Sequence, residues 1–178
     1  MVKVDRRQIL GGLAATALTF KPAFATGSDL RSLGLVRPPV AIDAPELNVP
    51  DLSGTIHRIE DYRGRTVIVS FWATWCPPCR KEMPTLARLG RELDSERFAV
   101  LAVNVGDAED RVRKFLAQVD LGDLPVLLDR KSELASKWFI RGLPVTYLLD
   151  DAGKVIYGAI GERVWDSPAM VTGLKSLG

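Results

Sequence analysis

Two hydrophobic patterns alternate along the chain from about residue 66 onward. Continuous runs of β-branched and aromatic residues predict buried strands, because a strand covered on both faces has no polar side. Between these runs, apolar residues recur at helical spacing. The predicted strands are 66–72, 98–105 and 124–129, and the predicted helices are 77–93, 107–119 and 132–139.

The C-terminal part breaks this alternation. Residues 145–150 and 154–161 predict two strands joined by a hairpin turn. Ser167-Pro168 predicts the start of a last helix, and Ser132 is expected to cap the helix over 132–139. Strands separated by helices and closed by a hairpin predict an α/β fold, with a mixed sheet flanked by helices on both faces.

The first 25 residues differ from the rest in composition. A basic start, a 12-residue apolar stretch and Ala23-Phe24-Ala25 predict a signal peptide cleaved after residue 25. The pair Arg6-Arg7 resembles a twin-arginine signal, so export by the Tat or the Sec route is expected. The apolar stretch is short for a membrane span, and a retained membrane anchor is the lesser alternative.

Removing this segment changes the charge balance. The whole chain has a formal net charge of +2, but residues 1–25 hold four of its 24 basic and one of its 22 acidic residues, which leaves −1. No basic surface for nucleic acid is therefore expected. We expect residues 26–46 to form an irregular lead-in and residues 47–178 to form one domain, with a monomer as the oligomeric state.

The two cysteines of the chain, Cys76 and Cys79, lie where a predicted buried strand meets a predicted helix. Pro77 and Pro78 separate them, and proline is well tolerated in the first turn of a helix. Cys76 then lies at the helix cap and Cys79 one turn further, close enough for a disulfide. The helix N-terminus favours a thiolate at Cys76, and a thiolate is the nucleophile of disulfide exchange. The motif predicts a redox-active pair.

Several other interpretations remain open. A structural disulfide is one, although so short a loop gives little stabilisation. A zinc site needs about four ligands, whereas the chain adds to its cysteines only His57, which is expected to be a half-exposed strand residue. A copper carrier and a peroxidase with Arg80 near its cysteine are the others. No metal and no cofactor are expected.

Three segments resemble one known family. "FWATWCPPC", "RKEMP" and "GLPVTYLLDDAGKVIYGAIG" are similar to the TlpA/ResA-like branch of exported thioredoxin-fold proteins, over roughly residues 40–178. The resemblance implies a thioredoxin fold with a central extra helix and strand, matched here by residues 108–129. It also implies an attacking role for Cys76 and a resolving role for Cys79.

The resemblance implies further site residues. Pro144 would be a cis-proline beside the cysteines, and Leu143 would offer its backbone to a partner peptide. Trp75 and Pro77 would contribute to the contact surface, and Glu82 would tune the cysteines. From the residues alone, a half-buried Trp75 and a solvated Glu82 on the helix are the lesser alternatives.

One position departs from cytosolic thioredoxins, which have a buried acid six residues before the first cysteine. Here that residue is Ser70. A proton acceptor is therefore absent from the strand, which gives Glu82 or water a larger part in the expected chemistry.

These observations predict a periplasmic thiol:disulfide reductase. Pro77 has no N–H to stabilise a Cys76 thiolate, which favours donation of electrons over oxidation. The family suggests disulfides of exported proteins as substrates, such as apocytochrome c or a copper-delivery protein, and a membrane electron donor. A periplasmic dithiol oxidase and a non-enzymatic module that binds copper or a partner are the alternatives.

Overall fold

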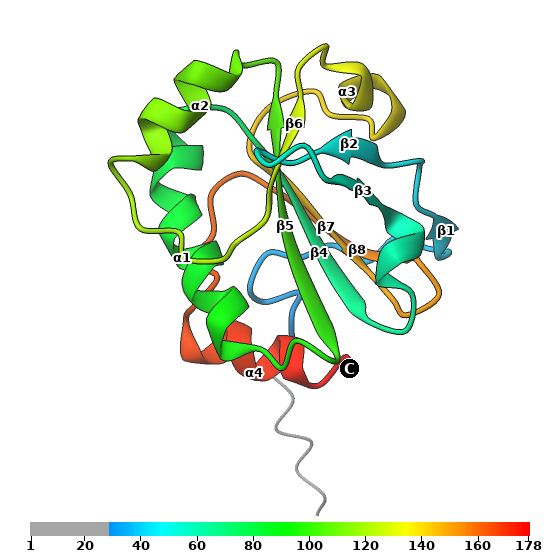
Figure 1. The fold of residues 1–178 in the computed structure, drawn as a ribbon. Coiled ribbons are helices and arrows are strands. Elements are labelled where there is room, and N and C mark those ends of the chain that lie inside the picture. The colour runs from blue at the N-terminus through cyan, green and yellow to red at the C-terminus, as the bar shows by residue number, and fades with distance from the viewer. Residues whose placement is uncertain (1–28) are drawn as a thin grey trace, which may run out of the picture.

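A six-stranded mixed sheet forms the centre of the computed structural model, which describes residues 29–178 (Figure 1). The strands are β1 (Ile42–Asp43), β4 (Thr66–Trp72), β5 (Phe98–Val105), β6 (Val126–Asp129), β7 (Val145–Leu149) and β8 (Lys154–Ile160). Their order in the sheet is β1-β8-β7-β4-β5-β6. The β4–β5 and β5–β6 pairs are parallel and the other pairs are antiparallel, so the predicted mixed sheet is confirmed.

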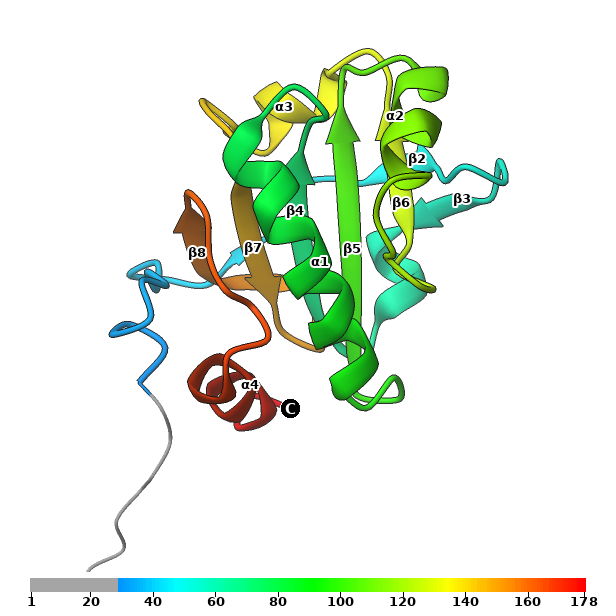
Figure 2. The ribbon, with the colours of Figure 1, turned by 90° about the vertical axis from the view of Figure 1, so that its left-hand side faces the viewer.

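Helices cover both faces of this sheet, as predicted. One face carries α1 (Pro77–Glu92), α2 (Glu109–Leu116) and α4 (Pro168–Lys175). Figure 2 shows α1 lying along the strands on this face. The other face carries α3 (Glu133–Lys137), the 3₁₀ helix η1 (Ile59–Tyr62) and residues of the hairpin of β2 (Asn48–Pro50) and β3 (Ile56–Arg58). The helix and strand expected within 108–129 are α2 and β6, and β6 is an edge strand.

Strand β4 is buried along its whole length. Its side chains alternate between two cores: Ile68 and Trp72 pack beneath α1, whereas Val67 and Val69 pack on the opposite side. This is why the strand has no polar side in the sequence. The chain leaves β4 at its carboxyl end and enters α1 within a few residues, so the cysteines lie at that edge of the sheet.

The structure corrects one predicted helix cap. Ser132 precedes α3 in the left-handed conformation, with φ at 56°, and its hydroxyl does not cap the helix. Instead the Asp129 carboxylate accepts hydrogen bonds from the backbone N–H groups of Glu133 and Leu134, both at 2.9 Å. The prediction for Ser167 is confirmed, because its hydroxyl accepts from the N–H of Met170 at 3.4 Å.

Part of the lead-in adds to the edge of the sheet. Val36 forms a bridge with Gly158, and β1 pairs antiparallel with β8. The predicted signal peptide lies outside the described residues. Within 29–178, no helix combines the length and apolar character needed to cross a membrane.

Candidate active site

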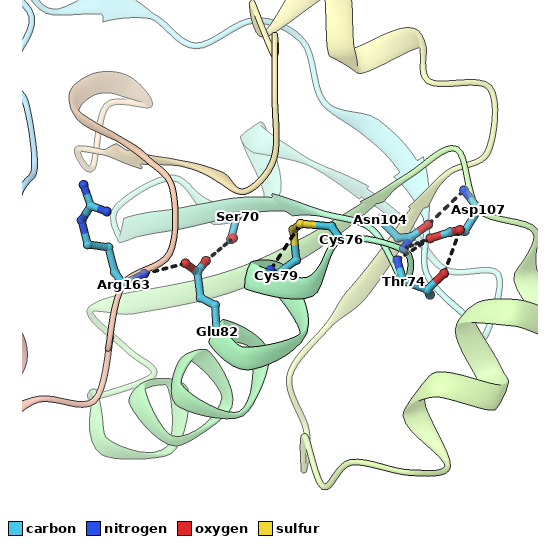
Figure 3. The surroundings of a disulfide bond; sticks show 8 residues. All are labelled: Ser70, Thr74, Cys76, Cys79, Glu82, Asn104, Asp107 and Arg163. Atoms are coloured by element: carbon cyan, nitrogen blue, oxygen red, sulfur yellow. Dashed lines mark hydrogen bonds between the residues drawn. A yellow bond between two sulfur atoms is a disulfide. The ribbon is translucent and has the colours of Figure 1, made fainter.

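The two cysteines form a disulfide at the start of α1 (Figure 3). Cys76 is the N-cap residue, and Pro77 and Pro78 occupy the first two helical positions, where their missing N–H groups leave no hydrogen bond unmade. The Cα atoms of Cys76 and Cys79 are 5.3 Å apart. The Cys79 N–H donates to the Cys76 sulfur at 3.3 Å. The predicted placement of this pair is confirmed.

The two cysteines are almost completely buried, and the exposed surface beside them is called the rim of the site; it includes Trp75. Cys76 is 3% exposed and Cys79 is 1% exposed, whereas Trp75 directly before them is 64% exposed. The half-buried interpretation of Trp75 is therefore wrong. An exposed indole beside a nearly buried sulfur provides apolar area where a substrate must approach.

Pro144 enters the sheet at the same edge. Its peptide bond with Leu143 is cis, as the resemblance implied. Val145 pairs with Phe71 near the carboxyl end of β4, which places Pro144 at the level where β4 ends. The Pro144 carbonyl accepts from the Gly161 N–H at 2.9 Å. Leu143 is half-buried, and within residues 29–178 its own backbone forms no hydrogen bond with another backbone group.

Glu82 is a buried acid on the same helix as the cysteines, so its interpretation as a solvated residue is wrong. Glu82 is only 1% exposed. One of its carboxylate oxygens accepts a hydrogen bond from the Ser70 hydroxyl at 3.2 Å, and the other accepts from the Arg163 backbone N–H at 2.9 Å. Burial raises the pKa of Glu82 to about 6, against the hydrogen bonds, which lower it. The nearby Trp165 side chain also lowers the pKa of Glu82, although its buried indole N–H does not meet the geometry of a hydrogen bond.

Ser70 lies on β4 where cytosolic thioredoxins have their acid. Its hydroxyl points to Glu82, so the carboxylate of the helix occupies the neighbourhood from which the strand acid is missing. The site therefore keeps one buried carboxylate near the disulfide, supplied by α1 instead of β4.

A second buried acid, Asp107, was not identified from the sequence. It lies between β5 and α2, is 4% exposed, and accepts from the N–H and hydroxyl of Thr74 at 2.7 and 2.9 Å. The Asn104 side-chain amide donates to it at 3.0 Å. Asp107 thereby holds the segment two residues before Cys76. In Figure 3 it lies on one side of the disulfide and Glu82 lies on the other.

A signal for Asp107 was present in the sequence. The buried strand 98–105 ends with Asn104, and Asp107 follows it closely. Because parallel neighbouring strands present their carboxyl ends at one edge of a sheet, a polar residue that follows one strand lies near the segment that follows the other. The hydrogen bonds themselves join residues 33 positions apart and follow only from the fold.

His57 is partly buried on β3, away from the cysteine motif. Its ring nitrogens face Asp51, at 3.2 Å, and the Tyr62 hydroxyl. Across residues 29–178, no group of three or more histidine, cysteine, aspartate or glutamate side chains is arranged to hold a metal ion.

The fold and this dithiol site define a class of protein, the thioredoxin-fold proteins with a Cys-Pro-Pro-Cys disulfide. Comparison with known proteins leads to the same class. Residues 40–158 match the AhpC/TSA family. The chain is 39% identical to the thiol-disulfide oxidoreductase ResA of Geobacillus thermodenitrificans over 116 residues, which is 65% of this chain and 66% of that protein, just under two thirds.

Solved structures give the same result. One described as a thiol:disulfide interchange protein DsbE from Chlorobium tepidum has a TM-score of 0.69 and 32% identity, over 78% of this chain and 97% of that one. The exposed lipoprotein thioredoxin Etrx1 of Streptococcus pneumoniae has a TM-score of 0.65 and 26% identity, over 74% and 99% of the two chains. The chain belongs to the AhpC/TSA family and, within it, to the ResA-like proteins of thioredoxin fold.

Proposed function

We propose that this thiol-disulfide oxidoreductase acts as a reductase of disulfides in exported proteins. The observation that carries the proposal is the Cys76–Cys79 disulfide at the first turn of α1, with only its rim open to solvent. In the reduced protein, the Cys76 thiolate attacks one sulfur of a substrate disulfide. A mixed disulfide forms, and the other substrate sulfur leaves as a thiolate.

The second step returns the substrate in reduced form. The Cys79 thiol loses its proton, and its thiolate attacks the Cys76 sulfur of the mixed disulfide. The second substrate sulfur leaves, so two electrons pass from the protein to the substrate. Glu82, one turn further along α1, is the proposed proton acceptor, because a carboxyl with a pKa of about 6 is mostly ionised at neutral pH.

The prolines support the direction of electron flow. Pro77 and Pro78 supply no N–H to the Cys76 sulfur, and only the Cys79 N–H reaches it. A Cys76 thiolate with fewer donors is less stabilised, and a less stabilised reduced form gives up its electrons more readily. A membrane electron donor is proposed to restore the dithiol.

The surface around the sulfur suits an extended peptide. The unpaired backbone of Leu143 can hydrogen-bond to a substrate strand next to the cysteines. Trp75 on one side and Ile160, 79% exposed at the end of β8, provide apolar contacts. The rim thus offers main-chain pairing, which is independent of the substrate sequence.

The redox potential tests the direction. Equilibration of the purified protein with glutathione or dithiothreitol buffers should give a value near or below about −230 mV, in the range of thioredoxins and glutaredoxins. A value near about −120 mV would instead identify the oxidase alternative. Tight Cu(I) binding without reduction of insulin disulfides would support a binding module.

Trapping identifies the substrates. Cys79→Ala leaves the mixed disulfide at Cys76 unresolved, so substrate proteins should accumulate as adducts that dithiothreitol releases. Cys76→Ala is the matched control and should trap none. Apocytochrome c and copper-delivery proteins are the candidates to look for among the adducts.

The predicted signal peptide supports a periplasmic location. The pneumococcal relative is described as an exposed lipoprotein, and the chain's first 25 residues have the composition of a signal peptide. A mature protein recovered from the periplasm should begin at Thr26. An N-terminus at residue 1 on a membrane-bound protein would indicate a retained anchor.

A further inference from the structure

A cationic groove lies against the active-site segment. It has a volume of about 290 Å³ and runs between the residues that flank the cysteines and helix α2. Thr74 and Trp75, the two residues before Cys76, form one side, and Arg111 and Lys114 on α2 form the other. The groove therefore begins within two residues of the attacking sulfur.

The charges of this groove have one sign. Arg80, Arg111 and Lys114 line it, and no acidic side chain does. Arg111 and Lys114 are 65% and 78% exposed, and each forms a long ion pair with an acid four residues earlier, with Asp107 at 3.8 Å and with Asp110 at 3.9 Å. Such exposed pairs are weak, so both cations can still attract an acidic partner. Residues 26–178 as a whole carry a formal charge of −1, so the cluster does not reflect a generally basic surface.

Aromatic packing holds one of these cations in place. The Arg80 guanidinium lies over the Phe115 ring, 5.6 Å from its centroid, and Phe115 in turn packs on Trp72 of β4, with 5.2 Å between centroids. A guanidinium supported in this way is already ordered before a partner arrives. Trp75 adds exposed apolar area at the same edge.

We propose that this groove selects substrate proteins whose disulfide is flanked by acidic residues. This inference rests on the proposed reductase function, because a polypeptide held by a mixed disulfide to Cys76 must pass over the adjacent surface. Acidic side chains next to its cysteine then meet Arg80, Arg111 and Lys114. Complementary charge of this kind speeds the encounter and favours one class of substrate over others.

Two disulfide-bonded peptides test the proposal. They are identical except that glutamates flank one cysteine in the first and glutamines in the second. The reduced protein is mixed with each, and the second-order rate constant of the exchange is measured. The glutamate peptide should react roughly 2- to 10-fold faster, as expected for two or three exposed charge pairs. Raising the salt from about 20 mM to about 0.5 M should remove this advantage.

Variants connect the advantage to the groove. The double variant Arg111→Gln/Lys114→Gln should lose most of the advantage of the glutamate peptide, and the remainder comes from Arg80. Lys175→Gln is the matched control, because Lys175 is also an exposed lysine 3.8 Å from an acid but lies on α4. It should keep the full preference.

The outcomes separate this inference from the reductase function. Equal rates for the two peptides, or a preference that the double variant keeps in full, would refute the proposed role of the groove in substrate selection. The reductase function would be unaffected. Failure to reduce either peptide would overturn both. If circular dichroism shows that the double variant is misfolded, the salt dependence of the wild-type protein tests the proposal instead. A preference for the glutamate peptide that persists at high salt would refute the proposed role of the groove.

Discussion

Replacement of Glu82 by glutamine tests the buried carboxyl beside the disulfide. Glutamine has the same shape and can still meet both neighbours, because its oxygen can accept from the Arg163 N–H and its amide can donate to the Ser70 hydroxyl. The substitution removes only the charge and its titration. Any difference that depends on pH then reports the ionisation of Glu82.

The pKa gives the magnitude and its sign. The pKa is 4.5 for an ordinary glutamate and about 6 in the folded protein, because burial disfavours the charged form. A raised pKa contributes stability that is complete below 4.5 and lost as the pH rises through about 6. A difference of this size corresponds to about 2 kcal/mol of unfolding free energy.

The assay is urea unfolding of both oxidised proteins between pH 4 and pH 8. Relative to the wild type, Glu82→Gln should gain about 2 kcal/mol in unfolding free energy between the lowest pH and pH 7, and little more above it. A difference that stays constant over this range would refute the reasoning. If Glu82→Gln instead became more stable relative to the wild type as the pH falls, the hydrogen bonds would lower the pKa of Glu82 by more than burial raises it.

The remaining predictions concern positions outside the cysteine motif. Asp107→Asn cannot accept both hydrogen bonds from Thr74 and should lower the unfolding free energy by about 1–3 kcal/mol; an unchanged urea midpoint would show that the contact is unimportant. Ser167→Ala should cost about 1 kcal/mol through loss of the α4 cap. Ser132→Ala is its control and should cost less than about 0.5 kcal/mol, since that hydroxyl caps nothing; equal losses would contradict the assignment.

Local rules in the sequence were sufficient to place the cysteine pair. A buried strand that ends at the motif and two adjacent prolines, which are well tolerated in the first turn of a helix, determine where Cys76 and Cys79 lie. The mixed sheet followed from the alternation of strands and helices in the same way. The cis form of Pro144 came only from the family resemblance, because most X-Pro bonds are trans.

Contacts between distant segments could not be predicted from the sequence. The Arg163 N–H that holds Glu82 comes from 81 residues further along the chain. The cap of α3 was assigned to Ser132 by composition, but the side chain of Asp129 at the end of β6 accepts the hydrogen bonds of the free N–H groups of Glu133 and Leu134. Where two acceptors compete for one helix end, only the backbone path decides between them.

The two buried carboxylates suggest how chemistry and selectivity are separated in this site. Asp107 fixes the segment before Cys76, and Glu82 is buried between Ser70 of β4 and the helix that carries both itself and Cys79, so neither can contact a substrate directly. The residues that can do so, such as Trp75 and Lys114, are exposed and form no part of either buried network. Substitutions at these exposed residues should therefore change which disulfides exchange with the protein and leave the environment of the sulfurs intact, whereas changes at Glu82 should affect every substrate alike.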